Sequence, residues 1–337
     1  MTDLPTLTAD GLETYLHCPR RYEFEHVHGL EGENDDSSRA RVDLLREAIC
    51  AALRSGATDR DRLEEIAGER LSELWTGHDE PFHSRTQRNH ERAVLDAVLE
   101  AYLEEVGADH ASGIDRLEAP ASELIGPALP LASERSLPAE DGSDRVRIDA
   151  AVDYVTLAES SLVGVSFVPT LSPLGLLRYR SDWEGDVAAL FVDHFDAGAE
   201  TFEPRAAGAL LETSVVVDGL RRLRERLDLE EKTCRYVQIP LADRYRTAVN
   251  WVQNTVDATV EPIDLTDVYL DHHTYAMTHE HRNETVDSRL VDVASDVLAE
   301  SFDPTPRWDE IAPESCPGCD YAVGCQDRLA AEVRFDG

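Results

Sequence analysis

Apolar residues recur at intervals of three and four along much of the first third of the chain, which is the spacing of a helix with one buried face. This pattern predicts helices over three segments: 42–53, 60–75 and 86–106. Together these segments predict a helical layer over residues 40–115 that precedes a sheet.

A period of two replaces the helical spacing at residue 144. In "RVRIDAAVDYV" the apolar side chains of Val146, Ile148 and Val152 share one strand face, and "LVGVSFVPT" continues as a second strand. We therefore predict a hairpin over 144–168 within a sheet core at 144–260.

The segments that follow interleave strand and helix patterns. "TCRYVQIPL" predicts a strand, and helical spacing predicts further helices over 183–195, 204–227, 243–256 and 286–299. Such interleaving favours a single α/β domain over residues 1–337, with a mixed central sheet flanked by helices.

The charge balance indicates the kind of environment in which the protein works. Net charge is −36, from 68 acidic and 32 basic residues, and Lys232 is the only lysine. Such acidity indicates a halophile, because molar salt shortens the Debye length to roughly 3 Å and screens an acidic surface. At high salt, this acidity argues less strongly against a nucleic-acid partner than it would in dilute buffer. Any DNA contact must then use local arginines and the shape of the surface.

Targeting signals are not evident in the sequence. The first sixteen residues have neither a basic region nor an apolar one, and no run approaches the ~18 apolar residues of a membrane span. We expect a cytoplasmic protein without membrane partners. Its six cysteines are then metal ligands or buried thiols rather than disulfides.

Four of the cysteines have the arrangement of a metal site. The run "CPGCDYAVGC" has C-x2-C-x5-C spacing and contains Cys316, Cys319 and Cys325. A fourth sulfur completes either a tetrahedral ion site or an iron-sulfur cluster, and Cys18 in "YLHCPRRYEFEHVHGL" is the candidate. A metal joining these ends closes a loop that costs roughly 5 kcal/mol to close. Spacing alone leaves Zn²⁺ open, and Cys50 and Cys234 are predicted core residues.

Both cysteine-containing stretches resemble the iron-sulfur branch of the PD-(D/E)XK nuclease superfamily. That branch includes CRISPR-associated exonucleases and the nuclease domains of bacterial recombination helicase-nucleases. The resemblance implies a restriction-endonuclease-like fold, with a 4Fe-4S cluster held by one cysteine before the core and three after it. It also implies that an iron-sulfur clasp, formed by residues 12–30 and 300–337, joins the termini.

The same resemblance implies where catalytic groups would lie. The family uses a histidine, an aspartate, and a carboxylate and lysine two residues apart on a strand, which bind Mg²⁺ or Mn²⁺ and activate water. Here these positions hold Arg46, Asp149, Ser166 and Val168. Serine supplies no anionic ligand and valine no positive charge, so we expect that hydrolysis is lost. Asp153, about 13 Å from Asp149 along the strand, is predicted to be a surface acid.

Two other functions stay open. The first is an active, metal-dependent DNA exonuclease whose catalytic groups have moved, with these candidates: Lys232, Arg178, Glu184 and Asp186. The second is a zinc-bound interaction module. The "DHHTYAMTHEHRN" stretch, with His272, His273, His279 and His281, fits no metal spacing and is predicted to face solvent.

The expected function is therefore a DNA-binding or scaffolding role in DNA recombination or repair. Arginine grips phosphate with two hydrogen bonds. The candidate DNA contacts are Arg20, Arg21, Arg39 and Arg41, with Arg46 beside them. Because Lys232 follows Glu231 instead of the glycine of a phosphate-binding loop, any helicase must be a separate partner chain. The sequence does not indicate an oligomeric state.

Overall fold

The structure is a computed structural model of the 337-residue chain. It describes residues 4–30, 32, 37–138, 144–169, 187–196, 198–199, 201–229, 232–241, 247–250, 255–269 and 283–332. Within these ranges, no helix is both long enough and apolar enough to cross a membrane.

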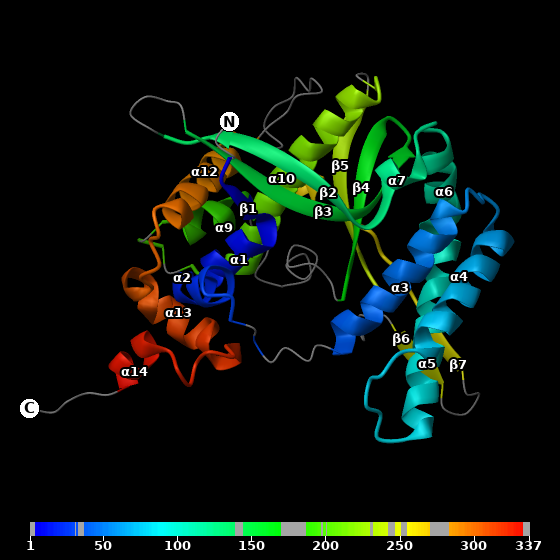
Figure 1. Cartoon of the computed structure of the whole chain (residues 1–337), viewed down its shortest axis with the longest axis horizontal. Helices are drawn as coiled ribbons and strands as arrows, with labels where there is room; N and C mark the ends of the chain where they lie inside the picture. The colour runs from blue at the N-terminus through cyan, green and yellow to red at the C-terminus, as the bar shows by residue number, and fades with distance from the viewer. Residues whose placement is uncertain are drawn as a thin grey trace, which may run out of the picture.

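A six-stranded mixed sheet forms the centre of the fold (Figure 1). Its strands are β1 (Thr6–Thr8), β2 (Ile125–Ser136), β3 (Arg145–Ala158), β4 (Ser161–Val168), β5 (Thr233–Pro240) and β8 (Ile263–Asp264). The long strand β3 pairs antiparallel with β2 along one edge. Its other edge is shared by β1, which runs parallel to it, and β4, which runs antiparallel. The β4–β5 pair is parallel, so the sheet is mixed as predicted.

Helices cover both faces of this sheet, and further helices pack around it. The described helices are α1 (Ala9–His17), α2 (Pro19–Tyr22), η1 (Glu23–Val27), α3 (Ser37–Arg54), α4 (Arg60–Thr76), α5 (Arg85–Tyr102), η2 (Leu103–Gly107), α6 (Ala108–Asp115), α7 (Ala121–Leu124), α9 (Val187–His194), α10 (Pro204–Arg226), α11 (Thr266–Tyr269), α12 (Glu284–Leu298), η4 (Thr305–Arg307), α13 (Trp308–Glu314), η5 (Cys316–Gly318) and α14 (Gln326–Glu332).

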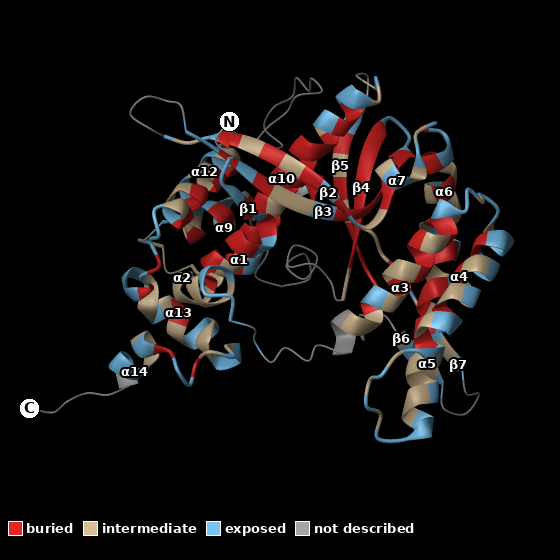
Figure 2. Ribbon diagram, viewed as in Figure 1, coloured by how far each residue is buried: buried red, intermediate tan, exposed pale blue. Residues whose placement is uncertain are grey.

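Two close approaches show how the sheet is enclosed. A Cβ at Gly164 of β4 would lie 3.2 Å from Leu220 of α10, and one at Gly113 of α6 would overlap Thr156 of β3. Thr156 pairs with Val163, the neighbour of Gly164, so the two contacts lie on opposite sheet faces. Buried residues accordingly fill β3, β4 and α10 (Figure 2).

Most predicted elements are confirmed. The three early helices, the 144–168 hairpin, the strand after residue 232 and the helices at 204–227 and 286–299 all form. The helix predicted over 243–256 is wrong, because the described part of that segment forms β6 (Thr247–Asn250) and β7 (Thr255–Ala258). Their burial alternates residue by residue, which is a strand pattern too short to recognise against helical spacing.

Segments from the two ends of the chain pack together beside the sheet. The blue helix α2 lies next to the orange helix α13 in Figure 1, with the red α14 beyond it. Tyr15 Oη donates a hydrogen bond to the carbonyl oxygen of Ser301 at 2.8 Å. The ring of Tyr22 stacks on Phe302 with centroids 5.8 Å apart. These contacts bring Cys18, at the junction of α1 and α2, to the C-terminal helices.

Candidate functional site

Strands β1 and β4 pair with different parts of one edge of β3 and leave a stretch of that edge unpaired between them. β1 pairs with β3 as far as Thr8 opposite Asp149, and β4 pairs with it from Val165 opposite Tyr154. Residues 150–153 lie between these two pairings, and we call this position the fork. Helix α1 begins directly after β1, with Thr8 Oγ1 accepting the N–H of Gly11, so the fork is bounded by a helix N-terminus.

Asp153 is the acid at the fork. Its side chain is 1% exposed, and Oδ1 accepts hydrogen bonds from Arg46 Nε at 2.8 Å and Nη2 at 2.7 Å. Oδ2 accepts the backbone N–H of Phe167 at 2.6 Å. Burial raises the pKa of the Asp153 carboxyl, while the Arg46 guanidinium lowers it. The prediction of a surface acid is wrong, because helix α3 covers this part of β3 and Arg46 projects from it.

A bulge in β2 also orients Asp153. The register between β2 and β3 shifts between Ile125 and Leu129, and Ala128 has a left-handed φ of 58°. The backbone N–H of Ala128 thereby reaches the Asp153 carboxylate. A left-handed alanine costs about 1 kcal/mol, so the carboxylate is held by a locally strained backbone.

Asp149 has a different setting. Its side chain is 36% exposed, and it accepts a hydrogen bond from Arg147 at 2.6 Å. It lies four residues before Asp153, or about 13 Å along the strand, and is not bonded to Arg46. The structure therefore brings Arg46 together with Asp153 and not with Asp149.

The other two predicted catalytic positions lie beside the fork. Ser166 is buried, and its hydroxyl donates to the carbonyl oxygen of Ala151 at 3.5 Å. Val168 ends β4 and is partly buried. Neither residue brings a charge to Asp153.

Lys232 is the proposed relocated group that lies among the described residues, and it is away from the fork. Lys232 Nζ donates to the carbonyl oxygen of Glu159 at 3.4 Å. Thr233 is paired with Ser161, at the opposite end of β4 from Ser166, so Lys232 lies at least ~16 Å from the fork. The other candidates, Arg178, Glu184 and Asp186, lie outside the described residues, as do His272, His273, His279 and His281.

A second acid, Glu212, lies near Ser166, and no sequence pattern predicted it. Tyr236 Oη donates to Glu212 Oε1 at 3.1 Å, and Gln238 Nε2 lies 3.4 Å from Glu212 Oε2. Gln238 is the β5 residue paired with Ser166. Burial raises the pKa of Glu212 to about 7, and Glu13 adds to the shift. Glu212 lies in a run of buried α10 residues, where sequence patterning does not distinguish it.

Cysteines from both ends of the chain form a second candidate site. We call residues 18–30 and 316–332 the cysteine lobe. Burial raises the pKa of the Cys18 thiol to about 11, and the neighbouring thiols of Cys316 and Cys319 raise it further. Cys325 has the same effect on Cys319. Cys18 therefore lies in the neighbourhood of the C-terminal three. The predicted core cysteines, Cys50 and Cys234, are buried elsewhere.

The donor chemistry of the lobe suits a thiophilic metal group. Among the residues that the structure describes, no three His, Cys, Asp or Glu side chains converge closely enough to hold one metal ion. A single Zn²⁺ needs each thiolate about 2.3 Å from one point. In an iron-sulfur cluster the thiolates bind different irons, so either group would use thiolate donors of the kind that these four cysteines supply.

The arginines predicted to contact DNA are occupied within the chain. The side chain of Arg39 lies outside the described residues. The other three form ion pairs: Arg20 with Glu23 and Asp327, Arg21 with Glu25, and Arg41 with Glu80 and Glu91. None of these three arginines presents an uncompensated positive charge.

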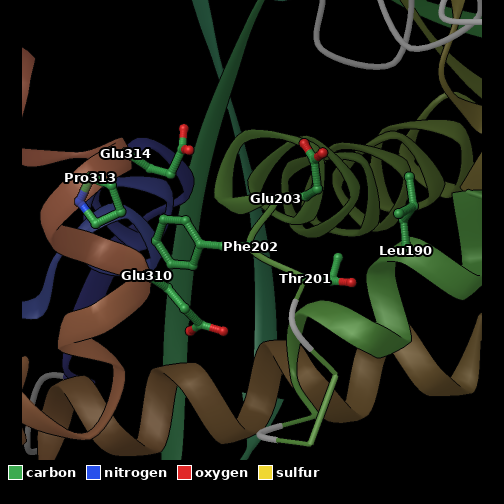
Figure 3. A pocket seen from close by; sticks show the side chains of 7 residues that line it. All are labelled: Leu190, Thr201, Phe202, Glu203, Glu310, Pro313 and Glu314. Atoms are coloured by element: carbon green, nitrogen blue, oxygen red, sulfur yellow. The ribbon is translucent and has the colours of Figure 1, made fainter. Parts of the chain in front are cut away.

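A hollow of about 440 Å³ lies between α9 and α13 (Figure 3). Its lining includes the carboxylates of Glu203, Glu310 and Glu314 and the ring of Phe202. Arg307 donates to Glu310 at 2.5 Å and so offsets part of that charge. The hollow includes neither Asp153 nor a cysteine, and is separate from both candidate sites.

One family model matches the part of the chain that contains the fork. Residues 6–165 match the family model of the PD-(D/E)XK nuclease superfamily. The matched segment runs from β1 into β4 and includes Arg46 and Asp153, but it ends one residue before Ser166. No curated protein matches the chain.

Proposed function

We propose that this chain is a PD-(D/E)XK nuclease-like protein that has lost hydrolysis and serves as a scaffold in DNA recombination or repair. One observation carries the proposal. Asp153, the acid at the fork, already has both carboxylate oxygens bonded by Arg46 and the Phe167 N–H.

The chemistry of phosphodiester hydrolysis explains why this matters. A divalent metal must be held by carboxylates so that it can activate water and stabilise the charge that develops on phosphate. Ser166 and Val168 supply neither a second carboxylate nor a cation, and the Arg46 guanidinium uses the ligand atoms of Asp153. The proposal therefore places the family's metal-binding position at Asp153 rather than Asp149.

In this proposal, the cysteine lobe binds a cofactor that has a structural role. Cys18, Cys316, Cys319 and Cys325 would hold a 4Fe-4S cluster, with Zn²⁺ as the alternative. Either group would fasten the N-terminal segment to the C-terminal helices, and folding free energy would then include the binding free energy of the metal. The mutual influence of the four thiols supports this assignment.

Scaffolding is favoured over direct grip on DNA. Arg20, Arg21 and Arg41 are neutralised by acids of the same chain, and the net charge is −36. A DNA contact would have to break these ion pairs. The partner in this proposal is a separate helicase or repair protein, because the chain's one lysine lies outside a phosphate-binding loop.

A nuclease assay tests the loss of hydrolysis. The purified protein is incubated at high salt with labelled single- and double-stranded DNA and Mg²⁺ or Mn²⁺, beside the Asp153→Asn and Asp149→Asn variants. We expect the same background for all three proteins. Cleavage by the wild type that either variant abolishes would instead establish an active exonuclease.

Metal analysis after anaerobic purification tests the cofactor. We expect iron and acid-labile sulfide, with the visible absorbance of a cluster. Colourless protein that contains zinc without iron would replace the cluster with a zinc-bound interaction module.

A further inference from the structure

We propose that Arg20 and Asp327 form a latch that positions Cys18 relative to Cys325, so that Arg20 acts on the cysteine site rather than on DNA. This inference rests on the proposed metal group. It assigns Arg20 as a positioning residue, since it acts through the two cysteines.

The latch joins the two halves of the cysteine lobe. Arg20 Nε donates to Asp327 Oδ2 at 2.8 Å, across 307 positions of the sequence. Arg20 follows Cys18 by two residues, and Asp327 follows Cys325 by two. Both side chains are largely covered, with 16% and 19% exposed, so solvent screens the pair less than an ordinary surface pair.

Each end of the latch also touches a cysteine. The backbone N–H groups of Arg20 and Arg21 donate hydrogen bonds to the Cys18 sulfur. At the other end, Cys325 Sγ lies 4.0 Å from the same Asp327 Oδ2 that Arg20 binds. Hydrogen bonds to ligand sulfurs and to their neighbours orient the ligands and tune a bound metal group.

Charge explains why Asp327 needs Arg20. When Cys325 binds a metal as a thiolate, a bare carboxylate 4.0 Å from its sulfur would repel it. The Arg20 guanidinium offsets this repulsion while it holds the N-terminal segment in place. The neighbouring Arg21 pairs with Glu25, one turn along the same segment, and its charge also acts on Cys319.

A second set of contacts holds the far end of the N-terminal segment. Tyr321 Oη donates to the carbonyl oxygen of Leu30 at 2.8 Å, and its ring lies 5.4 Å from that of Phe24. The N-terminal segment is therefore fixed to the C-terminal one at both ends, near Cys18 and near Leu30. Loss of the Arg20–Asp327 pair would release only the end that carries Cys18.

The test measures how fast the holo-protein loses its metal to a chelator, followed by visible absorbance or by metal content. Outer-shell substitutions typically weaken metal affinity by about 10-fold or more, and we expect Arg20→Ala and Asp327→Ala to release metal about 10-fold faster than wild type. Arg20→Lys keeps the charge and should fall between. Arg62→Ala, which removes an exposed ion pair with Glu65 outside the cysteine lobe, is the control and should behave as wild type.

Equal release rates for Arg20→Ala and Arg62→Ala would overturn the latch. A second readout, hydrogen exchange of residues 18–27 in metal-free protein, keeps the two proposals separate. If the wild type binds no metal, the proposed cofactor fails. The latch is then upheld by faster exchange in Arg20→Ala than in Arg62→Ala, and overturned by equal exchange. Asp327→Asn replaces Arg20→Ala if the latter does not fold.

Discussion

The fork and the cysteine lobe solve the same electrostatic problem in different ways. At the fork, the buried Asp153 carboxylate is neutralised by a cation of the chain, Arg46. In the lobe, burial and neighbouring thiols raise the pKa of Cys18 to about 11, and burial raises the pKa of Cys319 as well. The fork needs no added ion, whereas ionised thiols in the lobe would need one. Loss of metal should therefore destabilise the lobe and leave the fork unchanged.

Removal of Cys18 gives the largest expected effect. Cys18→Ser should eliminate bound metal and lower the free energy of unfolding by up to ~5 kcal/mol, because the clasp no longer closes the long loop between the termini. Iron and zinc analysis with urea denaturation measures both. Cys234→Ala, at a buried core cysteine, should keep the metal. Full metal content in Cys18→Ser would contradict the claim that the lobe, unlike the fork, binds a metal.

The Arg46–Asp153 pair should show the next largest effect. Arg46→Ala leaves a buried carboxylate without its cation, which typically costs about 3–5 kcal/mol. Arg147→Ala breaks the pair with Asp149, whose side chains are 48% and 36% exposed, and such pairs are worth at most ~1 kcal/mol. Urea denaturation of both variants at the same salt compares them. Equal losses would mean that the fork is an ordinary surface pair.

Glu212 offers a smaller, pH-dependent test of the region below the fork. Its pKa is about 7 in the fold against the ordinary 4.5, so the folded state holds a proton that the unfolded state releases. Its contribution is therefore fully present below pH 4.5 and is lost as pH rises to 7. Between pH 5 and 8 the wild type should lose ~2 kcal/mol more stability than Glu212→Gln. Parallel pH profiles in urea denaturation would contradict this.

The elements that the sequence predicted well have strong, long patterns. The β3–β4 hairpin and α10 are bounded by clear changes of period. Strand β2 was not predicted, since Pro127 and Pro130 interrupt its alternation. β6 and β7 have four residues each, too few for a period to establish itself.

The candidate site was partly predictable for a similar reason. Motif position pointed to Arg46 and Ser166, which both lie at or beside the fork. Motif position did not show that Asp153, rather than Asp149, is the acid there, because that depends on burial. Burial along β3 alternates as far as Ile148 and is continuous from Val152 to Leu157, where α3 and α6 cover the strand. The apolar run after Asp153 was the available signal. Asp327, which pairs with Arg20, and Glu80, which pairs with Arg41, come from distant segments, and single-sequence patterns do not contain such pairings.

Binding of Mn²⁺ to the fork is the most direct test of the central claim that Arg46 leaves no place for a metal at Asp153. Electron paramagnetic resonance of free Mn²⁺ can be titrated with wild type and with Asp153→Asn. We expect identical curves for the two proteins, because the carboxylate is already bonded to the guanidinium. A stoichiometric Mn²⁺ site in the wild type that disappears in Asp153→Asn would contradict the account.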